Sequence, residues 1–329
     1  MSAGARGNAV RRAAGRRLCI AVIAAVLGAS LGPGVPAADA AGASATAGSE
    51  PLSGGGAMGR GVFLTYGDRD TVIEGGTVAP LDLAAPVAQA AIDFTGLGFA
   101  LAALGYSPYS DAAGVINAFG GTELPLGSVS ERSRAKVTGR PPQESAVQWS
   151  ESAGRAQARL RDGPTAEART SAATTPDYGV AAQIGEIRAT VTTVNRTADS
   201  KVTVVLRSVR IGELSIDTIR LAADALADGA TGRAAATAVV EGVSLAGTPV
   251  RITPKGLEPV GASAPDLSLL NRAGIEILSA GGTLSQRGDR QSEARAIGPR
   301  IRFRSSDGRL VAVVLGEAVA TSTRDPRRG

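Results

Sequence analysis

The chain has 329 residues and a formal net charge of +5; 43% of its residues are hydrophobic but only 3% are aromatic. It contains no histidine and one cysteine, Cys19. The lack of histidine excludes Ser-His-Asp catalysis, histidine general bases and histidine metal ligands. A single cysteine cannot form an internal disulfide. Any active site would have to use carboxylates, serine with lysine, tyrosine or arginine.

The first 40 residues have the layout of a secretory signal peptide. Residues 1–17 carry five arginines and no acid, residues 18–31 (LCIAVIAAVLGASL) are an apolar run of 14, and Ala38-Asp39-Ala40 offers an Ala-x-Ala cleavage site. A membrane span needs about 20 apolar residues, so we expect cleavage after Ala40; an uncleaved anchor is the alternative. The pair Arg16-Arg17 leaves the twin-arginine export route open beside the general secretory route.

Removal of this segment changes how the charge is interpreted. Five arginines and one aspartate lie in residues 1–40, so the rest of the chain has a net charge of about +1 and no cysteine. A nucleic-acid-binding protein needs a basic patch within a recognisable module, and the sequence offers neither. We therefore expect a secreted or extracytoplasmic protein with no nucleic-acid partner and no membrane span after signal cleavage.

Residues 41–143 keep no period for long. Residues 41–58 are small, polar and glycine-rich, which predicts a disordered linker, with GGGAMG as linker rather than a phosphate-binding loop. Residues 59–143 are expected to form a mixed segment that packs on the β-rich part. Within it, two short apolar runs around Gly67-Asp68 predict a hairpin, and residues 87–93 and 111–119 predict short helical turns.

Residues 144–324 are expected to form a β-rich domain, followed by a polar tail over residues 325–329. Segments such as GEIRATVTTV, KVTVVLRSVRI and ELSIDTIRLAA alternate in polarity and are rich in Val, Ile and Thr, which is typical of strands. Asp307-Gly308 predicts a hairpin turn. Asp266 and Gly274 are the expected N-cap and C-terminal stop of one helix.

Glycine recurs between β-type runs. A glycine inside a strand pattern usually marks a bulge or a tight bend. The four segments concerned are IGEI (184–187), IGEL (211–214), IGPRI (297–301) and LGEA (315–318). Their unequal intervals exclude a regular repeat.

The segment VVEGVSLAGTPVRITPKGLEP (239–259) predicts a hairpin that turns at Ala246-Gly247. Strict alternation would place Val239, Glu241, Val243 and Leu245 on one face of its first strand. The predicted fold class is mainly β: an elongated, curved antiparallel sheet or sandwich with one C-terminal helix and short N-terminal helical turns.

Three segments carry a resemblance to known proteins: AQAAIDFTGLGFALAALGYSPY (88–109), VEGVSLAGTPVRITPKGLEPVG (240–261) and LLNRAGIEIL (269–278). In this order they resemble a group of uncharacterised, secreted, β-rich proteins of actinobacteria. Those proteins have a signal peptide, an AQAA-[LI]-D segment followed by a Tyr-Pro-containing loop, and a long-strand C-terminal part. The resemblance implies secretion and a β-rich fold, and it implies no particular activity.

No motif predicts a catalytic, cofactor-binding or metal-binding residue. Ser133 and Lys136 have the Ser-x-x-Lys spacing, but the segment is charged and lacks the Ser-Asp-Asn and Lys-Thr-Gly partners, so an exposed strand or loop is expected. The tripeptide Arg-Gly-Asp at 287–289 is expected to be an exposed turn. The carboxylates are scattered, and few aromatic residues are present to stack on a sugar.

The sequence therefore predicts a non-enzymatic structural or interaction protein that is secreted or held at the cell surface. The alternative is an extracytoplasmic carrier of a lipid or other apolar ligand, held in a groove between the helix and the curved sheet. A carboxylate-based hydrolase of unrecognised type is a further alternative. The candidate partners are a cell-wall polymer, a lipid and another surface protein, and no cofactor is expected.

Overall fold

The computed structural model describes residues 53–66, 81–104, 134–148, 154–163, 165–172, 179–194, 197–228, 232–261, 265–288, 290–304 and 310–324. All of them belong to one compact unit, which comprises residues 48–106 and 129–329. The expected signal peptide, the helical turn at 111–119, Ser133, the turn residues around Gly67-Asp68 and Asp307-Gly308, and the tail at 325–329 lie outside the described residues. The unit is mainly β, as predicted.

Nine antiparallel strands form the first sheet, here called sheet I. They are β1 (Gly54–Tyr66), β2 (Leu81–Ile92), β3 (Gly98–Ala103), β4 (Arg134–Gly139), β14 (Glu276–Ser279), β15 (Gly282–Gln286), β16 (Gln291–Ile297), β17 (Arg300–Arg304) and β18 (Leu310–Thr323). The order is β14-β17-β18-β1-β2-β3-β4. β17 and β16 both pair with the same edge of β18, β17 along its first part and β16 along its second part. β15 pairs with the other edge of β16. β18, from the end of the chain, thus pairs with β1 from its beginning.

The second sheet, sheet II, is an antiparallel meander of nine consecutive strands. They are β5 (Gln143–Gln148), β6 (Arg155–Arg161), β7 (Thr165–Ala172), β8 (Ala181–Val194), β9 (Thr197–Ile211), β10 (Leu214–Ala227), β11 (Arg233–Leu245), β12 (Thr248–Thr253) and β13 (Gly256–Pro259). The strands expected from the alternating segments are found here as β8, β9 and β10. The two-residue turn at Ala246-Gly247 joins β11 to β12, as predicted, with positive φ at both positions (48° and 82°).

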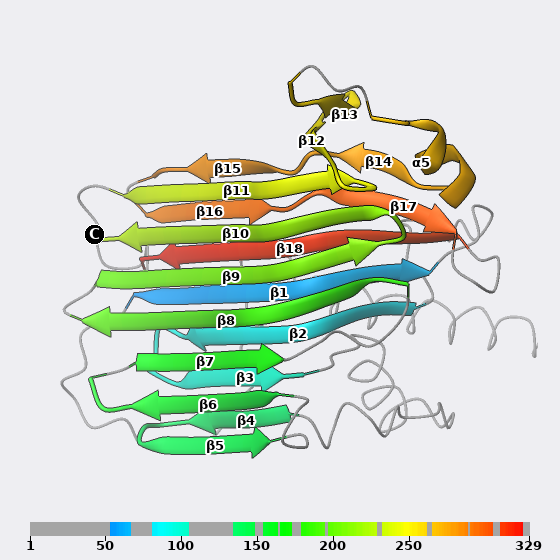
Figure 1. Cartoon of the computed structure of the whole chain (residues 1–329). Helices are drawn as coiled ribbons and strands as arrows, with labels where there is room; N and C mark the ends of the chain where they lie inside the picture. Colours follow the sequence, from blue (N-terminus) through cyan, green and yellow to red (C-terminus); the bar gives the residue numbers. More distant parts are fainter. Residues whose placement is uncertain are drawn as a thin grey trace, which may run out of the picture. The chain divides into compact units, whose positions relative to one another are not determined.

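The two sheets lie face to face, so that the core is the layer between them (Figure 1). Alternate residues of most strands point into this layer, and those are almost all Ala, Val, Ile or Leu; β15 is exposed along its whole length. Ile187, Leu206 and Ile219 of sheet II are fully buried there, as are Ala90 and Ala320 of sheet I. The small side chains make the core thin, which agrees with the low content of aromatic residues.

Glycines allow the closest approach of the sheets. A Cβ added at Gly59 of β1 would lie 2.5 Å from a methyl carbon of Ile187 and 3.1 Å from one of Val202. A Cβ at Gly55 would lie 2.5 Å from Ser200 Oγ, and one at Gly98 of β3 would lie 2.5 Å from Leu160. Real Cβ atoms do not approach other atoms so closely, so at these positions only glycine lets the facing strands pack together.

Two buried serines form hydrogen bonds across the core between the sheets at one end of β18, and their hydroxyl oxygens lie 3.1 Å apart. The Ser322 hydroxyl donates to the carbonyl of Ala225 on β10 (2.8 Å), and the Ser200 hydroxyl on β9 donates to the carbonyl of Thr321 (2.8 Å). Both serines are fully buried. Buried hydroxyl groups are stable only when they are hydrogen-bonded, and here the partners are main-chain carbonyls of the opposite sheet.

Replacing Ser322 with alanine is expected to lower the free energy of unfolding by about 1 kcal/mol, because the Ala225 carbonyl loses a donor. Urea denaturation followed by circular dichroism would measure it. The matched control is Ser285→Ala on the exposed strand β15, for which no measurable change is expected. Equal stability of the two variants would show that the Ser322 hydrogen bond contributes nothing.

The linker and the first helical turn were predicted wrongly. β1 begins at Gly54, inside the segment expected to be a disordered linker. The glycines of this segment are needed for the close approach of sheet II and do not indicate a flexible linker. A helical turn was expected over residues 87–93, but residues 87–92 belong to β2. Val87, Ala88 and Ala90 are all buried, so this strand has apolar residues on both faces and shows no polar alternation.

The expected C-terminal helix is a short α5 (Ser268–Ala273) of six residues, the only helix within the described residues. Its N-cap is Leu267 rather than Asp266, although Asp266 Oδ1 does accept the Ser268 N–H (3.0 Å). Gly274 ends the helix with a φ of 62°. Six residues cannot form a layer that covers a sheet. In the part of the chain that the structure describes, no helix has the length and apolarity needed to span a membrane.

The glycines within the predicted strands have different roles. Gly185 lies at a bulge, where the register between β8 and β9 shifts, as expected. Gly212 instead forms the turn between β9 and β10 with a φ of 54°. In β11, Gly242 has a φ of 65° and reverses the alternation, so Val243 and Leu245 are buried whereas Val239 and Glu241 are exposed. The predicted single face of this strand is therefore wrong.

Candidate functional site

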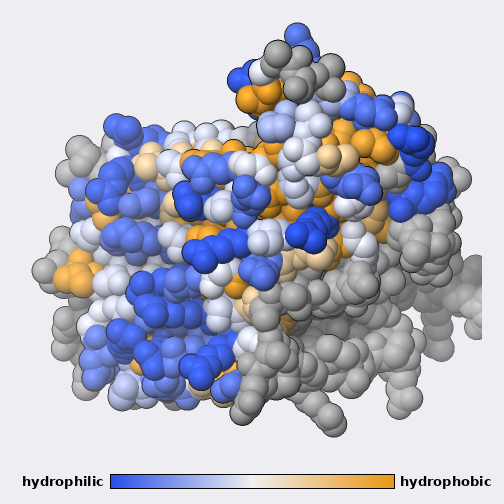
Figure 2. Space-filling model, viewed as in Figure 1, coloured by the Kyte–Doolittle hydropathy of each residue, from blue (hydrophilic) through white to orange (hydrophobic). Residues whose placement is uncertain are grey.

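The most distinctive arrangement of charged side chains lies on the outer face of sheet II. Hydrophilic side chains gather there over β5 to β8 (Figure 2). Alternation along β6, β7 and β8 turns five arginines to this side, because the intervening residues point into the core. This arginine cluster consists of Arg155, Arg159, Arg161, Arg169 and Arg188.

Glu167 on β7 lies at the centre of the cluster. Its Oε1 accepts a hydrogen bond from Arg169 Nε (2.6 Å) and lies 2.9 Å from Arg188 Nη2 in an ion pair, and its Oε2 lies 2.8 Å from Arg161 Nη2. The strand register explains the arrangement: Arg169 and Arg188 face each other directly across β7 and β8. Like charges opposite each other in a sheet are unfavourable, so the carboxylate between them is what makes this pairing stable.

The carboxylate and the guanidinium groups differ in their access to solvent. The Glu167 side chain is only 4% exposed, whereas those of Arg161, Arg169 and Arg188 are 52%, 41% and 44% exposed. Burial opposes ionisation of Glu167, but the hydrogen bond from Arg169 and the charges of Arg169, Arg188 and Arg161 outweigh it and lower its pKa below the ordinary value. Each guanidinium has five N–H donors, so donors that do not reach Glu167 remain available at the surface.

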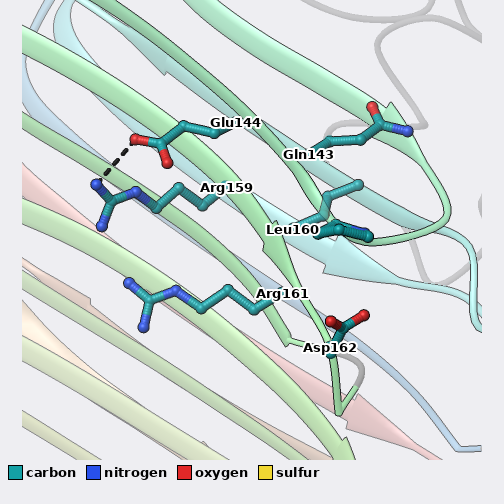
Figure 3. A pocket seen from close by; sticks show the side chains of 7 residues that line it. Gln143, Glu144, Arg159, Leu160, Arg161 and Asp162 are labelled. Atoms are coloured by element: carbon teal, nitrogen blue, oxygen red, sulfur yellow. Dashed lines mark ion pairs between the residues drawn. The ribbon is translucent and has the colours of Figure 1, made fainter.

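A second carboxylate, Glu144 on β5, extends the cluster toward the end of sheet II. Glu144 Oε1 lies 2.8 Å from Arg159 Nη2 and accepts a hydrogen bond from Gln157 Nε2 (2.7 Å). The Arg159 hydrogen bond is the main cause that lowers the pKa of Glu144. Glu144, Arg159 and Arg161 extend to the same side of the strands (Figure 3). They border an open hollow of about 560 Å³, and Pro142, Gln143, Leu160 and Asp162 complete its lining.

The charges of this face do not balance. Five arginines face four acids: Glu144, Glu167, the exposed Glu186 at the β8 bulge and Asp162 beside the hollow. The face therefore keeps a net positive charge of one. Within the described residues, no group of three or more Asp, Glu, Cys or His side chains could hold a metal ion. The chemistry that this surface offers is recognition of an anion.

The sequence matches no protein-family model and no curated protein. Among solved structures, the crystal structure of Pseudomonas aeruginosa OccK5 (OpdH) is similar with a TM-score of 0.14 and 10% identity, over 83% of this chain and 98% of that chain. A likeness at that score carries no inference about fold or function. The function must therefore be inferred from the residues themselves.

The motifs considered in the sequence are not brought together in the fold. Lys136 is exposed on β4, where its ammonium lies 5.7 Å from the centre of the Phe99 ring. Arg287 and Gly288 follow the exposed strand β15, and Asp289 lies outside the described residues. The arginine cluster was not predicted. The one sequence signal for the cluster is the segment RAQARLR (155–161). Its spacing places Arg155, Arg159 and Arg161 on one face of a strand, but it does not identify Glu167 as a partner.

Proposed function

We propose that this protein is a secreted or cell-surface interaction protein, without enzymatic activity, that binds an anionic polymer through the arginine cluster. The observation that carries the proposal is the set of three half-exposed guanidinium groups held around the buried Glu167 carboxylate. The carboxylate fixes the three side chains before any ligand binds. Fixed side chains lose little conformational entropy on binding, which favours affinity.

The geometry favours a polymer over a small molecule. Neighbouring strands lie about 4.8 Å apart, and same-face residues along one strand about 6.7 Å apart. The cluster therefore offers cations over a flat area rather than in a closed pocket, and the hollow beside it is open. Guanidinium groups bind phosphate and carboxylate with paired hydrogen bonds. A cell-wall polymer with phosphodiester or uronate groups fits this chemistry.

The carrier alternative has less support. A bound lipid needs an apolar cavity, and facing strands of the two sheets are too close even for a methyl group at Gly59 and Gly98. The expected wall of the groove, α5, has only six residues. The carboxylate-based hydrolase has less support as well, since Glu144 and Glu167, the two carboxylates of this cluster, are both engaged by arginines.

Binding to polyphosphate and to polygalacturonate, with neutral dextran as the reference polymer, would test the proposal. We expect the variant Arg161→Gln/Arg169→Gln/Arg188→Gln/Glu167→Gln to bind the anionic polymers at least about tenfold more weakly, the loss that corresponds to one charge-assisted hydrogen bond. Replacing Glu167 together with its partners avoids a buried, unpaired carboxylate. The variant lowers the net charge by two.

The matched control is Arg207→Gln/Arg210→Gln, which lowers the net charge by the same amount on exposed positions of β9 in the same sheet. It is expected to keep nearly the full affinity. Glu167→Gln alone adds one positive charge to the face, but it removes the acceptor that holds the three guanidinium groups, so it is expected to bind no more tightly than the wild type. An equal loss in both charge-matched variants, or no binding of either anionic polymer by the wild type, would refute the proposal.

A further inference from the structure

One long strand edge is open on the side away from the arginine cluster. β11 pairs with β10 along its whole length, but on its other side it pairs with β12 only at Ser244 and Leu245. From Arg233 to Val243 no strand within the described residues is hydrogen-bonded to the outer edge of β11. β11 and β15 lie together along this edge of the two sheets (Figure 1).

This open edge lacks the features that normally prevent strand pairing. Natural proteins protect edge strands with charges, prolines or short length. Here Ala234 to Val240 (AAATAVV) contains no charged residue and no proline. Its core-facing members Ala234, Ala236, Ala238 and Val240 are only partly buried, although they pack on the core. The core is thus left incomplete at this edge.

The two charged residues that flank the apolar stretch are self-complementary. Arg233 and Glu241 lie four residues to either side of Thr237, and all three are exposed. If two β11 strands pair antiparallel about a twofold axis at Thr237, Arg233 lies directly opposite Glu241 of the partner subunit. The symmetry repeats this contact, and Thr237 faces the partner's Thr237. Opposite charges and paired threonines are both favourable cross-strand neighbours.

Existing ion pairs extend this charge pattern over four strands. Arg233 Nη2 lies 3.3 Å from Asp224 Oδ1 on β10, and Arg220 Nη1 lies 3.1 Å from Glu241 Oε2. With two copies paired, Arg233 would lie between Asp224 and the partner's Glu241. The outer face would then carry a continuous row of alternating charges across the junction between sheet II of one copy and sheet II of the other.

The length of the open stretch fits the same register. At one end, Gly242 reverses the alternation and β12 occupies the neighbouring position beside Ser244. At the other end, β11 begins at Arg233, directly after Gly232, whose Cβ would lie 2.2 Å from the Gly288 carbonyl oxygen. The nine residues between these limits, 233–241, have Thr237 as their centre. The stretch can therefore pair with itself over its full length without displacing β12.

We propose that two copies of this chain associate through antiparallel pairing of their β11 edges in the register that places Thr237 opposite the partner's Thr237. The result joins strands β5 to β11 of both copies, seven from each, into one continuous sheet of fourteen strands, and β12 and β13 of each copy lie at the ends of the junction. Such an interface is isologous, since the same residues contribute from both copies. It leaves both arginine clusters on the same outer face, free to bind.

Light scattering coupled to gel filtration tests this pairing. The wild-type protein is expected to elute at twice the mass of one chain, and Thr237→Lys at the mass of one chain, because it places two ammonium groups opposite each other on the axis. Thr203→Lys, an exposed position on the outer face of β9, is the matched control and is expected to remain a dimer. Circular dichroism of both variants should match the wild type, which separates lost pairing from lost folding.

A charge exchange tests the register itself. Glu241→Arg is expected to weaken dimerisation by about tenfold or more, since it places like charges opposite each other twice. Arg233→Glu combined with Glu241→Arg restores the opposite pairs across the axis, although it places like charges beside Asp224 and Arg220 within each copy, and it is expected to dimerise more tightly than Glu241→Arg. A monomeric wild type, a dimeric Thr237→Lys variant, open-ended filaments, or a double variant that dimerises no more tightly than Glu241→Arg would each overturn the proposal.

Discussion

Replacing Gly59 with valine is expected to lower the free energy of unfolding by about 3 kcal/mol, the upper part of the range for overpacked cores. Gly59 lies on the inner face of β1, and its added Cβ would be 2.5 Å from Ile187, 3.1 Å from Val202 and 3.2 Å from Val204. All three neighbours are branched side chains of sheet II that are themselves buried. Relief of the overlap requires the two sheets to separate locally. Urea denaturation at neutral pH measures the effect.

Gly282→Val is the matched control for this experiment. Gly282 lies in the exposed strand β15, and a Cβ added there has no atom within 4 Å. The change is expected to alter the stability by less than about 0.5 kcal/mol. If Gly59→Val were as stable as the wild type, the sheets would not be in close contact at β1, and a cavity large enough for an apolar ligand would again be conceivable.

The strands that could be predicted are those in which one face is solvated. In β8, β9 and β10, threonine, arginine and aspartate alternate with Val, Ile and Leu because the outer face of sheet II meets water. Period two is then visible in the sequence. In β1, β2 and β3, Ala and Gly occupy inner positions and several outer positions are also buried, so the alternation is lost. Composition alone suggested a linker and helical turns there.

The candidate site shows a similar limit. Alternation in RAQARLR (155–161) is enough to place Arg155, Arg159 and Arg161 on one face. Their relation to Glu167 depends on which residues of β6, β7 and β8 lie opposite each other. Register is set by the buried pattern of a whole sheet and by its bulges, including the shift in β7–β8 between Thr170 and Ala172. A single segment cannot provide that information.

Glu167→Gln is expected to lower the free energy of unfolding by about 2 kcal/mol at pH 7, because three guanidinium groups lose an ionised acceptor. The size of this loss depends on pH. The pKa of Glu167 is lowered in the folded protein below its ordinary value of 4.5, so the unfolded chain binds a proton more readily. The stabilisation by the carboxylate is therefore fully present above about pH 4.5 and disappears as the pH falls through the folded pKa.

Denaturation of the wild type and of Glu167→Gln, at pH 7 and at intervals down to pH 3, tests both statements. The difference in stability should be largest at pH 7 and should narrow below pH 4.5, because a protonated glutamic acid resembles glutamine. Glu186→Gln, which removes an exposed carboxylate from the same face, is the control and is expected to change the stability by less than about 0.5 kcal/mol. A difference that stays constant with pH would mean that Glu167 acts through its packing rather than its charge. The three arginines would then need another explanation for lying side by side, and the candidate site would lose the element that holds it in place.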